Sequence, residues 1–301
     1  MIKRTIHIGS PCTLRRREQQ LVVQYPKELG MADKTVPIED LGVVILDHER
    51  VVVTQMLLAA LLANNVAVIT CNEQHMPTGM LLNLDGHTTQ TEIFRAQLEA
   101  SEPLRKNLWM QCVQAKLRNQ GAVLDRIGIG GDALREFARN VRSGDPDNLE
   151  ARGAAVYWKS VFPAAMNFVR HRHGEPPNNL LNYGYAILRA VVARSLVGSG
   201  LLPTYGIHHR SKYNAYCLAD DIMEPYRPWV DEAVLELLVK ERIDPKEVTT
   251  EIKGHLLKLP TKDVLLDGQR SPLLVAVQRT TAALARCFQE GERKGLWPEF
   301  T

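Results

Sequence analysis

Short apolar runs separated by polar and turn-forming residues fill the beginning of the chain. They lie at residues 21–23, 41–46 and 66–70, with Gly, Asp and Asn between them. Runs of this length between such breakers are typical of β-strands. The Leu- and Ala-rich run 56–63 instead favours a helix, with Thr54 as its N-cap. The pattern therefore predicts a small β-rich domain over residues 1–85.

The pattern changes after this region. Residues 71–91 are rich in Pro, Gly and Asp, which is typical of a linker or hairpin between unlike domains. Farther on, apolar residues recur at helical spacing, as in Leu104, Leu108, Cys112 and Leu117. We therefore expect an α+β protein, in which residues 86–301 form a larger, almost all-α domain.

Composition excludes some classes of function. The 301 residues carry a formal charge of only +3, so a nucleic-acid surface must come from local clusters of basic residues. The five cysteines are scattered, as in reduced cytosolic proteins. No signal peptide or membrane-length apolar run occurs, which predicts a soluble, cytoplasmic protein. Walker-type and Gly-x-Ser-x-Gly sequences are missing, which argues against a nucleotide-driven motor or a serine hydrolase.

Imidazole and carboxylate side chains gather in residues 206–231. The pair His208–His209 is followed by Asp220, Asp221 and Glu224, whose helical spacing can place carboxylates on one face. Nitrogen and oxygen donors without nearby thiolates suit Mn²⁺ or Mg²⁺ better than structural zinc. A structural ion-pair network, with Arg227 as the partner, explains the acidic cluster equally well.

Glu150 has two interpretations. It precedes the alanine-rich run 151–157 and follows Asp147 by three residues. That spacing is close to a capping box, with Asp147 as the N-cap of a helix, and acids in a first turn are favoured by the helix dipole. From the local sequence alone, helix capping is the better explanation of Glu150, and a catalytic role is the alternative.

Several motifs taken together resemble the CRISPR-associated Cas1 integrase family. The resemblance covers essentially the whole chain, with the motifs in family order, and it is greatest to members from Cas9-containing (type II) systems. The sheet-then-helix division is also that family's architecture. The motifs are Asn-Leu-Glu-Ala at 148–151, Ala-Ala-Val-Tyr-Trp at 154–158, Leu-Asn-Tyr-Gly-Tyr at 181–185, Gly-Ile-His-His at 206–209 and the run 218–228.

The resemblance implies a metal-dependent DNA endonuclease and integrase that inserts spacer DNA into a CRISPR array during antiviral defence. By residue, it assigns the Mg²⁺ or Mn²⁺ site to Glu150, His209 and Asp221. His208 and Asp220 are the neighbours that compete for this assignment. In the implied reaction the 3′-hydroxyl of the spacer attacks a repeat phosphodiester, and His209 serves either as a ligand or as a proton shuttle.

Partners follow from the same resemblance. The chain is expected to bind protospacer and repeat DNA and the Cas2 protein, and to form a homodimer through the β-rich domain, with the dimers assembled on Cas2. A Cas9 effector is a further candidate partner. Two rival functions remain: a branched-DNA repair nuclease and a non-catalytic DNA-binding scaffold. Candidate phosphate contacts, chosen because they flank the proposed site in sequence, are Arg152, Arg189, Arg194, Arg210 and Lys212.

Overall fold

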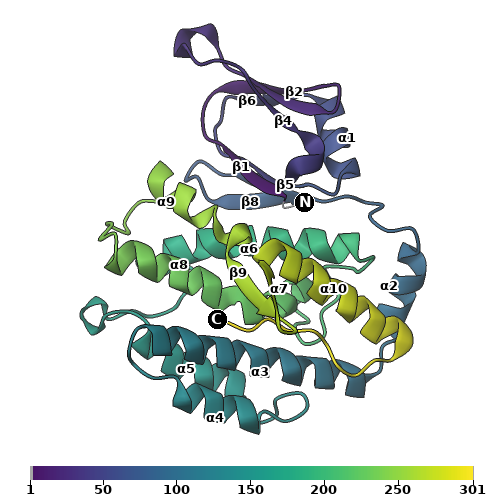
Figure 1. Ribbon diagram of the computed structural model, residues 1–301, viewed down its shortest axis with the longest axis vertical. Coiled ribbons are helices and arrows are strands. Elements are labelled where there is room, and N and C mark those ends of the chain that lie inside the picture. The colour runs from purple at the N-terminus through teal and green to yellow at the C-terminus, as the bar shows by residue number, and fades with distance from the viewer. Residues whose placement is uncertain (1–2, 301) are drawn as a thin grey trace.

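The N-terminal part of the chain contains two four-stranded sheets. The computed structural model describes residues 3–300, and this part lies at the top of Figure 1. Strands β1 (Arg4–Ile8), β5 (Leu41–Leu46) and β7 (Ala67–Cys71) are parallel, and β8 (Pro77–Leu81) runs antiparallel beside β7. The second sheet has the order β4 (Lys34–Pro37), β3 (Gln20–Gln24), β2 (Cys12–Arg17) and β6 (Val51–Val53).

The expected strands and helix of this part are present. The apolar runs 21–23, 41–46 and 66–70 lie in β3, β5 and β7, and α1 (Gln55–Ala63) begins after Thr54. Leu14, Leu21, Leu41 and Leu57 are buried together between the two sheets and α1. Each such side chain contributes about 1.5–3 kcal/mol when fully buried, so these leucines stabilise a core distinct from that of the helical part.

The rest of the chain is mostly helical, which confirms the expected fold class. The helices are α2 (Gln90–Glu99), α3 (Glu102–Arg126), α4 (Asp132–Asn140), α5 (Leu149–Ser160), α6 (Asn178–Gly198), α7 (Cys217–Met223), α8 (Arg227–Val239), α9 (Thr250–Leu256) and α10 (Leu273–Glu290). A hairpin of β9 (Asp263–Leu266) and β10 (Gln269–Pro272) interrupts them. Its turn residues Asp267 and Gly268 have φ values of 52° and 71°, as a two-residue Asp-Gly hairpin turn requires.

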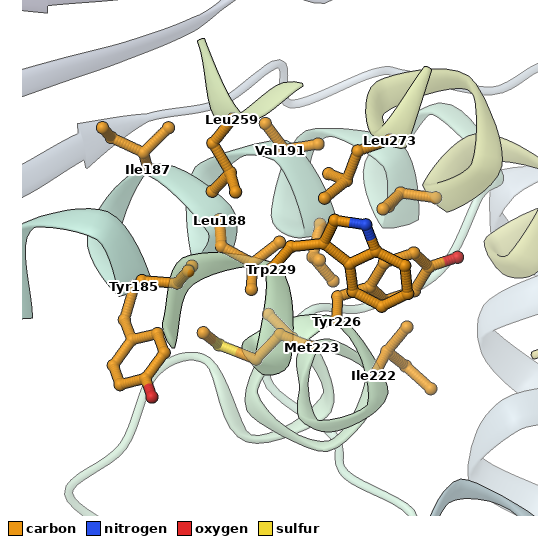
Figure 2. Close-up of a cluster of buried hydrophobic side chains, with 14 of the residues drawn as sticks. Tyr185, Ile187, Leu188, Val191, Ile222, Met223, Tyr226, Trp229, Leu259 and Leu273 are labelled. Atoms are coloured by element: carbon orange, nitrogen blue, oxygen red, sulfur yellow. The ribbon is translucent and has the colours of Figure 1, made fainter. Parts of the chain in front are cut away.

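Helix α6 runs through the centre of the helical part. Almost all of it is buried, and it packs against α7, α8 and α10. Figure 2 shows Leu188 and Val191 of α6 beside Tyr226 and Trp229. The Trp229 indole N–H donates to the backbone oxygen of Asp263 at 2.9 Å, which ties α8 to the hairpin. This buried framework fixes the backbone around α7.

Helix α3 positions two other elements. It packs both against α5 and against the short 3₁₀ helix Glu224–Tyr226. The approach of α5 is close at Gly153, where an added Cβ would lie 2.2 Å from Cδ2 of Leu117. Residues from α5 and from the end of α7 are therefore brought together beside α3.

Two further expectations from the sequence concern the cysteines and membrane-spanning helices. All five cysteines are unpaired, and Cys12, Cys112, Cys217 and Cys287 are buried. Within residues 3–300, no helix has both the length and the apolar character needed to cross a bilayer.

Candidate metal centre

The two histidines lie on a turn that is held by Asp221. Both backbone N–H groups of the turn donate to this carboxylate, from His208 to Oδ2 at 3.0 Å and from His209 to Oδ1 at 3.2 Å. Nδ1 of His209 lies 2.5 Å from the same Oδ1. Gly206 makes this approach possible, because a Cβ there would lie 2.6 Å from Oδ2 of Asp221.

These contacts determine how each histidine is presented. The hydrogen bond to Asp221 raises the pKa of His209, although burial lowers it. Since Nδ1 faces Asp221, Nε2 is the ring nitrogen left for a metal. The His208 ring stacks on Trp109 with a centroid distance of 4.1 Å, and burial lowers the pKa of His208. His209 is therefore the better placed ligand of the pair.

Asp221 has little freedom to bind a metal itself. Its side chain is completely buried, and both oxygens accept hydrogen bonds from the histidine turn. A carboxylate with this role orients a ligand rather than acting as one. The contacts thus favour Asp221 as a positioning residue for His209.

Glu150 lies in the first turn of α5, but its side chain does not cap that helix. Asp145 does so: its carboxylate accepts from the backbone N–H groups of Leu149 and Glu150, each at 2.9 Å. Asp147, the N-cap expected from the sequence, instead pairs with Arg142 at the surface. The Glu150 carboxylate is thereby free to reach inward, where it accepts a hydrogen bond from Nζ of Lys116.

Glu224 lies on the other side of Lys116. Its Oε2 is 2.6 Å from Nζ of Lys116, and its Oε1 is 2.9 Å from Nε of Arg227. Burial raises the pKa of Glu224, but Arg227 and Lys116 outweigh it and lower this pKa to about 2. Oε2 is buried, and its contact in the described part of the chain is the Lys116 ammonium. A buried carboxylate oxygen in this state is well suited to bind a cation.

The residues present fit a divalent metal in their chemistry. Glu150 and Glu224 supply carboxylate oxygens, and His209 supplies an imidazole nitrogen on the adjacent turn. The charges of His209 and Glu224 are close enough to affect each other's pKa values. Among residues 3–300, no three potential ligands are already grouped tightly enough to hold an ion. Lys116 lies between the two carboxylates.

The neighbouring Asp220 belongs to an ion-pair network. Its Oδ1 accepts from Nε of Arg189 at 2.7 Å, and its Oδ2 accepts from the side-chain amide of Asn214 at 2.7 Å. The structural interpretation of the acidic cluster is therefore correct for Asp220. Arg227, the partner expected from the sequence, pairs with Glu224 of the same acidic cluster.

The basic residues expected to contact phosphate differ in exposure. Arg194 is only 2% exposed, and its Nε donates to the backbone oxygen of Asn65, so the prediction for Arg194 was wrong. Arg189 is engaged by Asp220. Arg152 is exposed beside the Phe137 ring. Arg210 and Lys212 are exposed and line a pocket of about 300 Å³ next to His209.

Three functional candidates were missed from the sequence. Arg105 lines the same pocket, and its Nε has no hydrogen-bond partner within residues 3–300. Trp109 supports the His208 ring. Lys116 follows Leu108 and Cys112 at the same four-residue spacing along the buried face of α3. A lysine at an apolar helix position was the available signal, since buried lysines are rare unless paired.

The comparisons with known proteins agree on one family. A family model for the CRISPR associated protein Cas1 matches residues 6–268. A CRISPR-associated endonuclease Cas1 of Neisseria meningitidis serogroup C (strain 8013) is 38% identical over 288 residues, covering 95% of this chain and 90% of the relative.

Solved structures share the fold at lower sequence identity. A casposase bound to integration product aligns with a TM-score of 0.80 and 19% identity, over 98% of this chain and 92% of the other. A chain of a Cas6-RT-Cas1–Cas2 complex aligns with a TM-score of 0.77 and 18% identity, over 99% of this chain and 36% of the other.

Proposed function

Because the chain belongs to the Cas1 family of CRISPR-associated proteins, we propose that it is a metal-dependent DNA endonuclease and integrase that inserts spacer DNA into a CRISPR array. The observation that carries the proposal is the pair of the half-buried Glu150 and the buried Glu224, which meets at Lys116 beside the His209 turn. The Neisseria relative is named an endonuclease, and the casposase in the solved structure is bound to an integration product. Both names support nuclease and strand-transfer chemistry.

The proposed ligands are Glu150, Glu224 and Nε2 of His209, for Mg²⁺ or Mn²⁺. An ion bound there supplies Lewis-acid stabilisation of the charge that develops on the attacked phosphate. The sequence-based set has Asp221 in place of Glu224 and stays the alternative. We favour Glu224 because both carboxylate oxygens of Asp221 are in contact with N–H groups or the ring nitrogen of the histidine turn.

The chain's own residues then position the DNA. Asp221 fixes the His209 ring with Nε2 outward, while Trp109 supports the His208 side of the turn. Arg105, Arg210 and Lys212 line the adjacent pocket and can neutralise backbone phosphates without reading bases. The spacer's 3′-hydroxyl replaces one phosphodiester by another, so the reaction needs no nucleotide energy source. The lack of a phosphate-binding loop motif is compatible with this exchange.

The proposal includes partners and an assembly. Two hydroxyl attacks on opposite strands need two active sites, which a homodimer paired through residues 1–85 and assembled on Cas2 would supply. Val52 on β6 and Met56 on α1 are apolar side chains in this part of the chain with exposed fractions of 58% and 59%, and a partner bound there would cover them. The structural similarity to a chain of the complex that contains Cas2 supports the choice of partner.

Strand transfer of a labelled duplex into a repeat-bearing plasmid tests the function. With Cas2 and Mn²⁺ or Mg²⁺, the wild-type chain should join a donor with a 3′-hydroxyl and fail with a 3′-deoxy donor. Glu150→Gln, His209→Ala and Glu224→Gln should give no product while remaining folded. Asp132→Asn is the matched control, because this acid is exposed in α4, and it should transfer normally.

The same assay separates the rival functions. Normal transfer by the three site variants would support the non-catalytic scaffold and reject the metal centre. Cleavage of branched DNA at full rate without Cas2, together with no strand transfer, would support the repair nuclease.

A further inference from the structure

Lys116 is a buried cation between two candidate metal ligands. Its side chain is 7% exposed, and its ammonium contacts both the Glu150 carboxylate and Oε2 of Glu224. These two acids come from different elements, α5 and the 3₁₀ helix after α7. A single lysine thus balances a pair of carboxylates that would otherwise repel each other in a poorly hydrated site.

A divalent ion and this ammonium compete for the same oxygens. An ion held by both Glu150 and Glu224 would take the place between the two carboxylates where Nζ now contacts Oε1 of Glu150 and Oε2 of Glu224. Two cations in that place repel strongly where little water screens them. Both cannot occupy the gap, so the lysine must move before both carboxylates can bind the ion.

Bound DNA offers a new partner for the displaced ammonium. Lys116 has a flexible stem, and a backbone phosphate is an anion that an ammonium pairs with readily. Such an exchange of partners would make metal binding weak in the free chain and stronger when DNA is present.

We propose that Lys116 is the resident cation of the Glu150–Glu224 pair and that it restrains metal binding until DNA is bound. The inference rests on the proposed metal centre and adds an order of events to it. It assigns Lys116 no step in the chemistry itself.

Titration of Mn²⁺ into the purified chain, followed by the electron paramagnetic resonance of the free ion, tests the inference. Without DNA, Lys116→Met should bind Mn²⁺ about tenfold more tightly than the wild type, or more, because the competing charge is gone. Lys116→Gln, which keeps a hydrogen-bond donor without the charge, should also bind more tightly. A duplex with 3′-deoxy ends should strengthen binding by the wild type and have a much smaller effect on Lys116→Met.

The matched control is Lys253→Met. Lys253 is also buried and paired, with Nζ 2.6 Å from Oδ2 of Asp47, but it lies away from the two acids. Its replacement should leave the Mn²⁺ affinity unchanged. Melting curves with and without Mn²⁺ would show that each variant is folded, and Mn²⁺ should raise the melting temperature most for Lys116→Met.

The possible failures can be distinguished. Equal or weaker Mn²⁺ binding by folded Lys116→Met and Lys116→Gln would overturn the inference, provided that Glu150→Gln abolishes wild-type binding. If neither the wild type nor any variant binds Mn²⁺ with or without DNA, the metal centre fails and this inference fails with it.

Discussion

Asp221→Asn and Glu224→Gln should affect the chain in different ways, because the two carboxylates have different contacts. Asp221 accepts from the backbone N–H groups of His208 and His209 and faces Nδ1 of His209. Asp221→Ala leaves these donors without an acceptor. Hydrogen bonds to a charged group contribute about 1.5–3 kcal/mol each, and water at the partly exposed turn replaces part of this. We expect a loss of about 3 kcal/mol for Ala and about 1 kcal/mol for Asn.

Metal binding separates the two roles further. Asp221→Asn should weaken Mn²⁺ binding by about 10–100-fold, as loss of a ligand's supporting partner does. Glu224→Gln removes a direct ligand and should weaken it by more than about 100-fold. Asp220→Asn is the control and should leave the affinity unchanged, since Asp220 pairs with Arg189 and Asn214.

Urea unfolding of each variant in the presence of a chelator measures its stability without metal. Titration of each variant with Mn²⁺ measures its metal affinity. Normal Mn²⁺ binding by Glu224→Gln, together with complete loss in Asp221→Asn, would refute this reasoning. The ligand set expected from the sequence would then be correct.

Other predictions follow from packing, titration and charge. Gly153→Ala should lower the free energy of unfolding by about 1–3 kcal/mol in urea, because the new Cβ would meet Leu117. Gly254→Ala in α9, where the space is open, should be neutral or stabilising by up to about 1 kcal/mol. Equal losses of stability in the two variants would contradict the packing argument. Burial raises the pKa of Asp231 to about 6, so the folded chain holds this proton more tightly than the unfolded chain. Stability should therefore rise as the pH falls from above 6 towards about 4, by up to about 3 kcal/mol. Unfolding at about pH 7.5 and pH 5 should show this gain relative to Asp231→Asn, and the same difference at both values would refute it. Arg210→Gln and Lys212→Gln should each reduce the slope of log affinity against log salt by about 0.9 in DNA binding, and unchanged slopes would exclude phosphate contact by these residues.

Much of the fold was predictable because its signals are local. The runs in β3, β5 and β7 are short, apolar and bounded by breakers, and each became a strand. The β9–β10 hairpin was overlooked inside a region read as helical. Its Asp267–Gly268 pair is a strong two-residue turn signal, and it was available in the sequence.

The site was predictable only in part because its contacts join residues far apart in the chain. The resemblance identified Glu150 and His209 as candidates, and both lie at the proposed centre. It could not show that Asp145, rather than Asp147, caps α5. Nor could it show that the carboxylate of Asp221 accepts hydrogen bonds from the histidine turn. Arg194 failed as a phosphate contact because proximity in sequence says nothing about burial, which here is nearly complete.

The most direct test of the central claim is the position of Mn²⁺ in crystals of the chain with a 3′-deoxy DNA duplex, measured by anomalous diffraction. The account predicts a peak about 2.1 Å from carboxylate oxygens of Glu150 and Glu224 and from Nε2 of His209, with Lys116 moved away from the acid pair. A peak bound by Asp221 or Asp220 instead, or no peak near these residues in crystals that contain DNA and Mn²⁺, would contradict it.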